Sequence, residues 1–135
     1  MILDAQGADE IAIVDINASL NAQLIDPALI TSIVYRCRLP IAAGGGIRNL
    51  NDARKCFAAG ADKIIVNTHA VLNPDLVADL AAEFGSQSVM VSIDVEKEAG
   101  QYQVRTFSGK RRVTETLDDL LVQFVENGAG EIMLT

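Results

Sequence analysis

The sequence predicts an α/β protein built around a parallel sheet, and three observations support this. Short, nearly all-apolar runs alternate with stretches that carry helix signals, a pattern typical of repeated βα units. The pentapeptides GADEI, GADKI and GAGEI begin at Gly7, Gly60 and Gly128, which indicates one recurring turn from a helix into a strand. The 135 residues are 50% hydrophobic and 21% charged, so the chain can bury a sizeable core.

Each element has its own signal. Five apolar runs are expected to be strands buried on both faces: Ile11–Ile16, Leu39–Ala43, Ile64–Asn67, Val89–Val95 and Ile132–Thr135. Four helices are expected to start at capping residues: Asp26 before Pro27, Asn51 before Asp52, Asn73 before Pro74, and Thr116 with Asp119 three residues on. Left-handed caps are expected at Gly60, Gly85 and Gly128. Ala99–Gly100 followed by Tyr102–Phe107 predicts a β-hairpin inserted before the last helix.

Composition excludes several classes of partner and compartment. The net charge of −7 argues against nucleic acid and anionic membranes, which both require a basic surface. No apolar run reaches the roughly 18 residues of a membrane span, and the N-terminus lacks the pattern of a signal peptide. We therefore expect a cytoplasmic protein. Cys37 and Cys56 have no CxxC spacing and fit buried, reduced thiols, so neither a metal nor another cofactor is indicated.

Polar and glycine residues end every predicted strand, at the edge where parallel α/β folds bind ligands. Gly44–Gly46 form a turn whose N–H groups can approach an anion, and Asn67 and Thr68 would add side-chain donors from the next strand. We interpret this group as a phosphate site that includes Gly45 and Gly46. The alternative is a tight turn with only a structural role.

Two aspartates end strands in the same way. Asp94 follows an apolar run, a setting that suits a general acid or base, although it could also be a helix cap or a solvated loop residue. Asp15 could share acid–base work with it or could simply hydrogen-bond at its strand end.

Charged residues begin three strands at the opposite edge. Glu10, Lys63 and Glu131 would converge there, with Asp62 beside them, and by default such residues form a charge cluster that serves stability. His69, the single histidine, has no spacing partner and is expected to be a loop residue without a role.

Six strings, taken in order, resemble one family over essentially the whole chain: VDINAS, AAGGGI, GADKIIVNT, FGSQSVMVSID, FSGK and GAGEIMLT. That family is the cyclase subunit of imidazole glycerol phosphate synthase, from histidine biosynthesis. The resemblance implies a (β/α)₈ TIM barrel, of which residues 1–135 would form a single partial domain, since a full barrel needs about 250 residues. It also implies a lyase reaction in an amidotransferase complex. Ammonia from a glutaminase partner converts PRFAR, which carries two phosphates, to imidazole glycerol phosphate and AICAR.

The resemblance also assigns roles to residues. Asp94 matches the general acid or base of the fifth barrel strand. The phosphate and substrate residues are Asp15, Gly45, Gly46, Asn67, Thr68, Ser108, Gly109 and Thr135. Glu10, Lys63 and Glu131 match three of four charges of a gate through which ammonia enters, and Asp62 matches a residue that faces the glutaminase. Asn17 and His69 stand where the family usually has Thr and a small residue.

The matched segment corresponds to strands two to six of eight. We therefore expect a second aspartate, a second phosphate site and a gate arginine to lie outside it, and the chain alone to be weakly active or inactive. Two alternatives remain open. One is a paralogous subunit that passes ammonia to a nucleotide-sugar amidotransferase of surface-polysaccharide synthesis. The other is a non-catalytic half-barrel module, which we expect to self-associate through its open sheet edges.

Overall fold

A computed structural model describes residues 7–135. Its seven strands are β1 (Ile11–Val14), β2 (Ile41–Gly44), β3 (Lys63–Val66), β4 (Val89–Glu98), β5 (Gln101–Thr106), β6 (Arg111–Arg112) and β7 (Glu131–Leu134). Its helices are α2 (Pro27–Val34), α3 (Leu50–Ala58), α4 (Thr68–Leu72), α5 (Asp75–Phe84) and α6 (Leu117–Glu126), with a short 3₁₀ helix, η1, at Ser86–Ser88.

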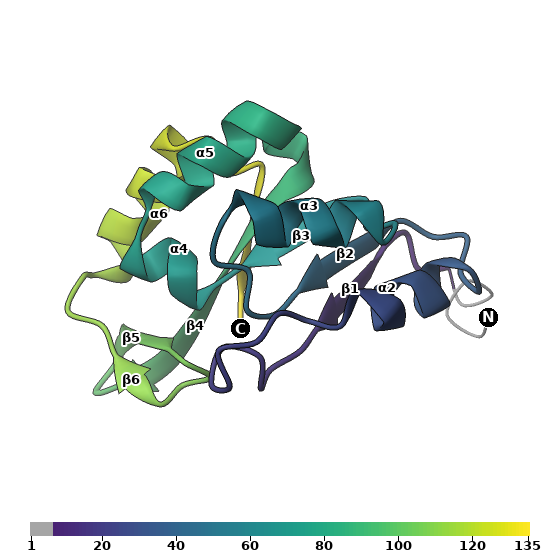
Figure 1. Ribbon diagram of the computed structural model, residues 1–135. Helices are drawn as coiled ribbons and strands as arrows, with labels where there is room; N and C mark the ends of the chain where they lie inside the picture. The colour runs from purple at the N-terminus through teal and green to yellow at the C-terminus, as the bar shows by residue number, and fades with distance from the viewer. Residues whose placement is uncertain (1–6) are drawn as a thin grey trace.

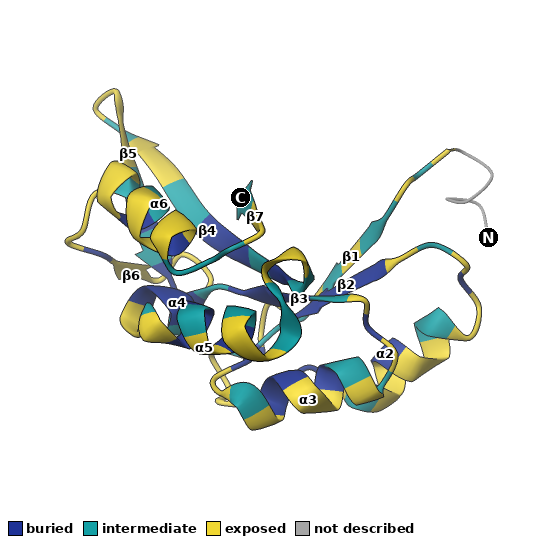
Figure 2. Cartoon of the chain, turned by 90° about the horizontal axis from the view of Figure 1, so that it is seen from above, coloured by how far each residue is buried: buried dark blue, intermediate teal, exposed yellow. Residues whose placement is uncertain are grey.

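The predicted parallel sheet is confirmed. Strands β1, β2, β3, β4 and β7 pair in that order, all parallel, and the sheet does not close into a barrel within the described residues. Figure 1 shows the parallel strands β1 to β4, with the hairpin strands β5 and β6 beyond them. Figure 2 shows the sheet bent like a trough whose outer side carries α2, α3 and α5. A parallel sheet of this kind brings the carboxyl ends of all five strands to one edge.

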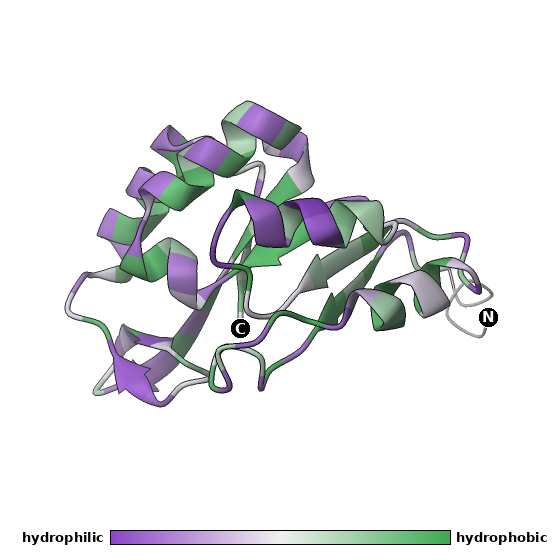
Figure 3. Ribbon diagram, viewed as in Figure 1, coloured by the Kyte–Doolittle hydropathy of each residue, from purple (hydrophilic) through white to green (hydrophobic). Residues whose placement is uncertain are grey.

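The core lies between the sheet and the helices. The central strands contribute Ile64, Val66, Val91 and Ile93, each at most 1% exposed, and they pack against helix residues such as Phe124. Each such side chain contributes about 1.5–3 kcal/mol on burial, so this layer supplies most of the stabilisation. Figure 3 shows the apolar sides of α5 and α6 turned inward and their polar sides turned to solvent.

Two predicted caps are confirmed. The Asp26 carboxylate accepts a hydrogen bond from the N–H of Ala28 at 2.9 Å, and the Thr116 hydroxyl accepts one from Asp119 at 3.1 Å. Gly60, Gly85 and Gly128 follow their helices with positive φ, as predicted.

Three helices differ from the prediction. Helix α3 begins two residues early, because Asn49 rather than Asn51 is the capping residue and accepts the N–H of Asp52, and the half-buried Leu50 already packs on the core. Helix α5 is preceded by Pro74, and Asn73 contributes its backbone carbonyl rather than a side-chain cap. Helix α4 was not predicted; it forms because Ala70 and Val71 are buried directly after β3.

The predicted hairpin is confirmed but is larger than expected. Strand β4 continues to Glu98 and pairs in antiparallel fashion with β5 across the Ala99–Gly100 turn, with Asp94 opposite Arg105. Strand β6 then pairs with β5, so the turn between them, residues 107–110, is held at the carboxyl edge of the sheet.

Candidate functional site

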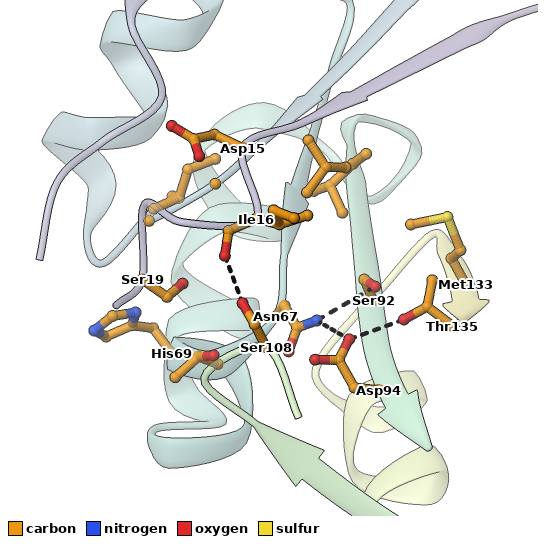
Figure 4. Close-up of a pocket in the computed structure, with 16 residues that line it drawn as sticks. Asp15, Ile16, Ser19, Asn67, His69, Ser92, Asp94, Ser108, Met133 and Thr135 are labelled. Carbon is orange, nitrogen blue, oxygen red and sulfur yellow. Dashed lines mark hydrogen bonds between the residues drawn. The ribbon is translucent and has the colours of Figure 1, made fainter. Parts of the chain in front are cut away.

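A pocket lies at the carboxyl edge, where β1, β2, β3, β4 and β7 all deliver residues (Figure 4). Its volume is about 260 Å³. Eight of the predicted site residues line it: Asp15, Gly45, Gly46, Asn67, Thr68, Asp94, Ser108 and Thr135. Gly109, the ninth, adjoins Ser108 in the hairpin turn but is not part of the lining. The remaining lining residues are Val14, Ile16, Ser19, Ile47, Ile65, His69, Ser92 and Met133.

Asp94 is held by two side chains from neighbouring strands. Its Oδ1 accepts hydrogen bonds from Asn67 Nδ2 at 2.7 Å and from the Thr135 hydroxyl at 2.8 Å (Figure 4). Thr135 reaches it because its backbone continues the β7 ladder, pairing with Ile93 and Val95 on either side of Asp94. Within residues 7–135 no hydrogen bond reaches Oδ2, so one carboxylate oxygen is fixed and the other remains available to a ligand.

The glycine turn after β2 is packed too closely for any side chain. A Cβ on Gly46 would lie 1.7 Å from the backbone oxygen of Gln23, and one on Gly45 would lie 2.9 Å from Asp15 Cβ. Both glycines also have positive φ, +128° and +68° for Gly45 and Gly46. Their backbone therefore forms part of the pocket wall itself, and a ligand can approach it without meeting a side chain.

The hairpin turn is tied to the pocket at two points. The buried Thr68 hydroxyl accepts the N–H of Phe107 at 3.0 Å, and the Ser108 hydroxyl donates to the backbone oxygen of Ile16. Phe107, Ser108 and Gly109 all have positive φ, so this turn is strained and its shape depends on those contacts. The hairpin thus links the loop after β1 to the residues that follow β3.

Asp15 makes the hydrogen bond predicted for its strand end. It lines the pocket, and its Oδ1 also accepts the N–H of Asn17 at 2.9 Å, which shapes the turn after β1.

The expectation for His69 was wrong in its placement. His69 is not a loop residue: it belongs to α4, and its side chain lines the pocket. Partial burial lowers the pKa of its imidazole, and the nearby Arg48 acts in the same direction, while Asp52 opposes them. The histidine has no spacing partner in the sequence. Its place as the second residue of α4, a helix that was not predicted, brings it to the pocket.

At the opposite edge the predicted charge cluster is formed. Lys63 Nζ lies 2.7 Å from Glu10 and 2.6 Å from Glu131, so one lysine joins the amino ends of three strands. The hydrogen bonds that Lys63 donates to Glu10 and, to a smaller extent, to Glu131 raise the pKa of its ammonium group. Asp62 is exposed beside the cluster, and its carboxylate accepts the N–H of Ile41 at 2.8 Å.

Comparison with known proteins decides the family. The family model described as "Histidine biosynthesis protein" matches residues 1–135. The chain belongs to this histidine biosynthesis family. It is 41% identical over 133 residues to the imidazole glycerol phosphate synthase subunit HisF of Dictyoglomus thermophilum, covering 98% of the chain and 53% of that relative. The HisF subunit of Caulobacter vibrioides is 41% identical over 134 residues, covering 98% and 52%. That of Thermotoga sp. strain RQ2 is 39% identical over 129 residues, covering 96% and 51%.

The resemblance to HisF read from the six strings is therefore confirmed, and the chain spans about half the length of the curated relatives it matches. Family membership also explains the open parallel sheet with alternating helices, which is a partial (β/α)₈ barrel. Among the described residues, no helix is long and apolar enough to cross a membrane. The same part of the chain holds no group of three or more metal-ligating side chains.

Proposed function

We propose that this HisF-like chain forms part of a cyclase site that binds PRFAR and uses ammonia to convert it to imidazole glycerol phosphate and AICAR. The observation that carries the proposal is Asp94. Its Oδ1 is fixed by Asn67 and Thr135, and its Oδ2 is available at the wall of a pocket. A carboxylate oriented in this way can take a proton from the attacking nitrogen and return one to a leaving group.

In this proposal one phosphate of the substrate binds against the glycine turn. Gly45 and Gly46 offer backbone without side chains, and Thr68 and Asn67 enter the same pocket from β3. Asp15 and the hairpin residues Ser108 and Gly109 complete the substrate cleft. The hairpin is suited to this because Ser108 already bridges to the loop after β1.

The amino edge of the sheet is proposed as the side where ammonia enters. The Glu10–Lys63–Glu131 cluster lies at the amino ends of the strands, and the pocket lies at their carboxyl ends. A small neutral molecule that travels along the strands from the cluster would therefore reach the pocket that holds Asp94. Asp62 is exposed next to the cluster and would face a glutaminase partner.

The test is ammonia-dependent turnover of PRFAR by a full-length cyclase subunit that carries this segment, because the 135-residue chain alone is expected to be weakly active or inactive. PRFAR binding is measured separately by calorimetry. Asp94→Asn keeps the size of the side chain and should lower kcat by about 10²–10⁴-fold while leaving binding nearly unchanged. Glu96→Gln, two residues along β4 and outside the pocket, is the matched control and should retain turnover. Turnover that survives Asp94→Asn would overturn the assignment, and failure of PRFAR to bind would overturn the site.

We also propose that the 135-residue chain associates with a second copy of itself. Val14 at the end of β1 is 46% exposed, Ile16 just after β1 is 67% exposed, and Leu134 in β7 is 51% exposed. Strands β1 and β7 are the two outer strands of the parallel sheet. Outer strands with exposed apolar side chains recruit further strands. Light scattering coupled to size-exclusion chromatography should give a dimer or larger species, and a folded monomer at micromolar concentration would refute this.

A further inference from the structure

The pocket has an unusual charge balance for a site that would hold a phosphate at its glycine turn, Gly45 and Gly46, which we call the phosphate end. Of the 16 residues that line the pocket, two are carboxylates, Asp15 and Asp94, and none is lysine or arginine. A pocket that binds a phosphate dianion ordinarily supplies positive charge. Within this lining only one side chain, that of His69, can become a cation.

The nearest arginine is already engaged. Arg48 Nε lies 3.0 Å from Asp52 Oδ2, and Arg48 Nη1 donates to the backbone oxygen of Ala22 at 3.0 Å. Asp52 is 2% exposed and also accepts the N–H of Arg48, so this pair is fixed beneath the turn and does not line the pocket. Arg48 therefore neutralises Asp52 and leaves the cationic role in the pocket unfilled.

His69 is free to take that role. Within residues 7–135 neither nitrogen of its ring makes a hydrogen bond to the protein, although the side chain is half-buried. In the view of Figure 4, His69 and Ser19 lie on one side of Asn67, and Asp94 and Thr135 lie on the other. The imidazole thus belongs to the part of the pocket away from the proposed proton-transfer group.

We propose that His69 is the cationic ligand of the phosphate end, so that this chain holds a phosphate monoester through an imidazolium and binds it more tightly as the pH falls. The proposal rests on the function proposed above, because it assumes a phosphorylated ligand in this pocket. Binding of the dianion would draw one proton from solvent onto the ring. Two charged groups act on the ring: Arg48 disfavours the imidazolium and Asp52 favours it. Asp15 and Asp94 line the same pocket, and both are negatively charged groups that would not disfavour a cation there.

Protonation of His69 and binding of phosphate affect each other, and this fixes the direction in which the affinity changes with pH. In the free chain the pKa of His69 lies below its usual value of about 6.5, so the ring is neutral near pH 7. A bound dianion favours the imidazolium and should raise that pKa. A rise of one unit means that the protonated form binds about tenfold more tightly than the neutral form.

The experiment uses the fact that His69 is the single histidine of the sequence. Its ring C–H resonance is titrated by NMR with and without saturating inorganic phosphate, and phosphate affinity is measured from about pH 8 to about pH 6. Because inorganic phosphate itself gains a proton within this pH range, each affinity is compared with that of His69→Gln, which keeps a donor but cannot carry charge. The ratio of wild-type to variant affinity should rise up to about tenfold as the pH falls. Leu72→Ala, on the exposed side of the same helix and outside the lining, should change nothing.

The outcomes separate the two proposals. If the amides of Gly45 and Gly46 respond to phosphate but the pKa of His69 does not move and His69→Gln binds equally well at every pH, the role of His69 is refuted and the phosphate site stands. If neither the glycine amides nor the ring responds to phosphate, both are refuted. The dependence of PRFAR turnover on Asp94 is measured independently and tests the catalytic assignment alone.

Discussion

Replacing Gly46 by alanine should cost far more than replacing another glycine of similar conformation. Two effects add at this position. The positive φ of +68° costs an L-residue about 1–2 kcal/mol. In addition, the new Cβ would lie 1.7 Å from the Gln23 oxygen, which would have to retreat by about 1.3 Å to reach 3.0 Å, the closest approach that Cβ atoms ordinarily make.

That movement breaks local hydrogen bonds. Gln23 donates to the carbonyl of Ala18 at 2.9 Å, and Ile25 donates to that of Gly45 at 2.9 Å. Losing one of them costs about 1–1.5 kcal/mol. We therefore expect Gly46→Ala to lower the free energy of unfolding by about 2–4 kcal/mol and to weaken binding at the glycine turn.

Gly100→Ala is the matched control. Gly100 has φ +86°, and a Cβ there meets no atom within 4 Å, so only the conformational cost of about 1–2 kcal/mol applies. Urea unfolding of both variants, analysed as a two-state transition, measures the difference. Equal losses of stability in the two variants would refute the argument that close packing against the loop after β1 fixes this turn.

Three further predictions concern a cap and two titrations. Thr116→Ala removes the acceptor of the Asp119 N–H and should destabilise the chain by about 1 kcal/mol in urea unfolding, whereas Thr114→Ala, whose hydroxyl is exposed, should cost less than half of that. Burial raises the pKa of the Cys56 thiol to about 11, so the folded chain holds that proton more tightly than the unfolded chain does. The free energy of unfolding should therefore fall as the pH rises from about 9 to about 11. A Cys56→Ala variant that shows the same loss would contradict this. The Glu10 and Glu131 contacts raise the pKa of Lys63. Its stabilising contribution is therefore present below pH 10.5 and is lost as the pH rises through the higher folded-state pKa. The free energies of unfolding of the chain and of Lys63→Met should converge over that rise in pH.

The order of elements was readable from the sequence because it depends on local patterns. Apolar runs predicted the strands, although burial on both faces holds for the inner strands β2 and β3 and not for the outer strands β1 and β7. Asp26 and Thr116 cap helices through atoms two or three residues away. Parallel topology alone brings strand-end residues to one edge, so the sequence predicted that Asp94 and Asn67 lie at the same edge of the sheet. Their hydrogen bond was not predicted.

What the sequence did not reveal depends on long-range contacts. The start of α3 was misplaced because the choice between Asn49 and Asn51 is made by packing of Leu50 on the core. The role of the Ser108 turn as a bridge to Ile16 joins residues far apart in the chain, and no local pattern signals it. His69 was missed for the same reason, since only its position at the start of α4 turns it into the pocket.

Three consecutive residues after β3 serve three different parts of the site. Asn67 donates a hydrogen bond to Asp94, Thr68 holds the hairpin turn through the N–H of Phe107, and the side chain of His69 lines the pocket. In the proposed function this one short segment would act on proton transfer, on the shape of the cleft and on anion binding, so a change in its backbone should disturb all three. Side-chain substitutions can still separate them: His69→Gln should alter anion affinity without disturbing Asp94, because the amide that holds Asp94 belongs to Asn67 and is fixed by β3 rather than by the histidine.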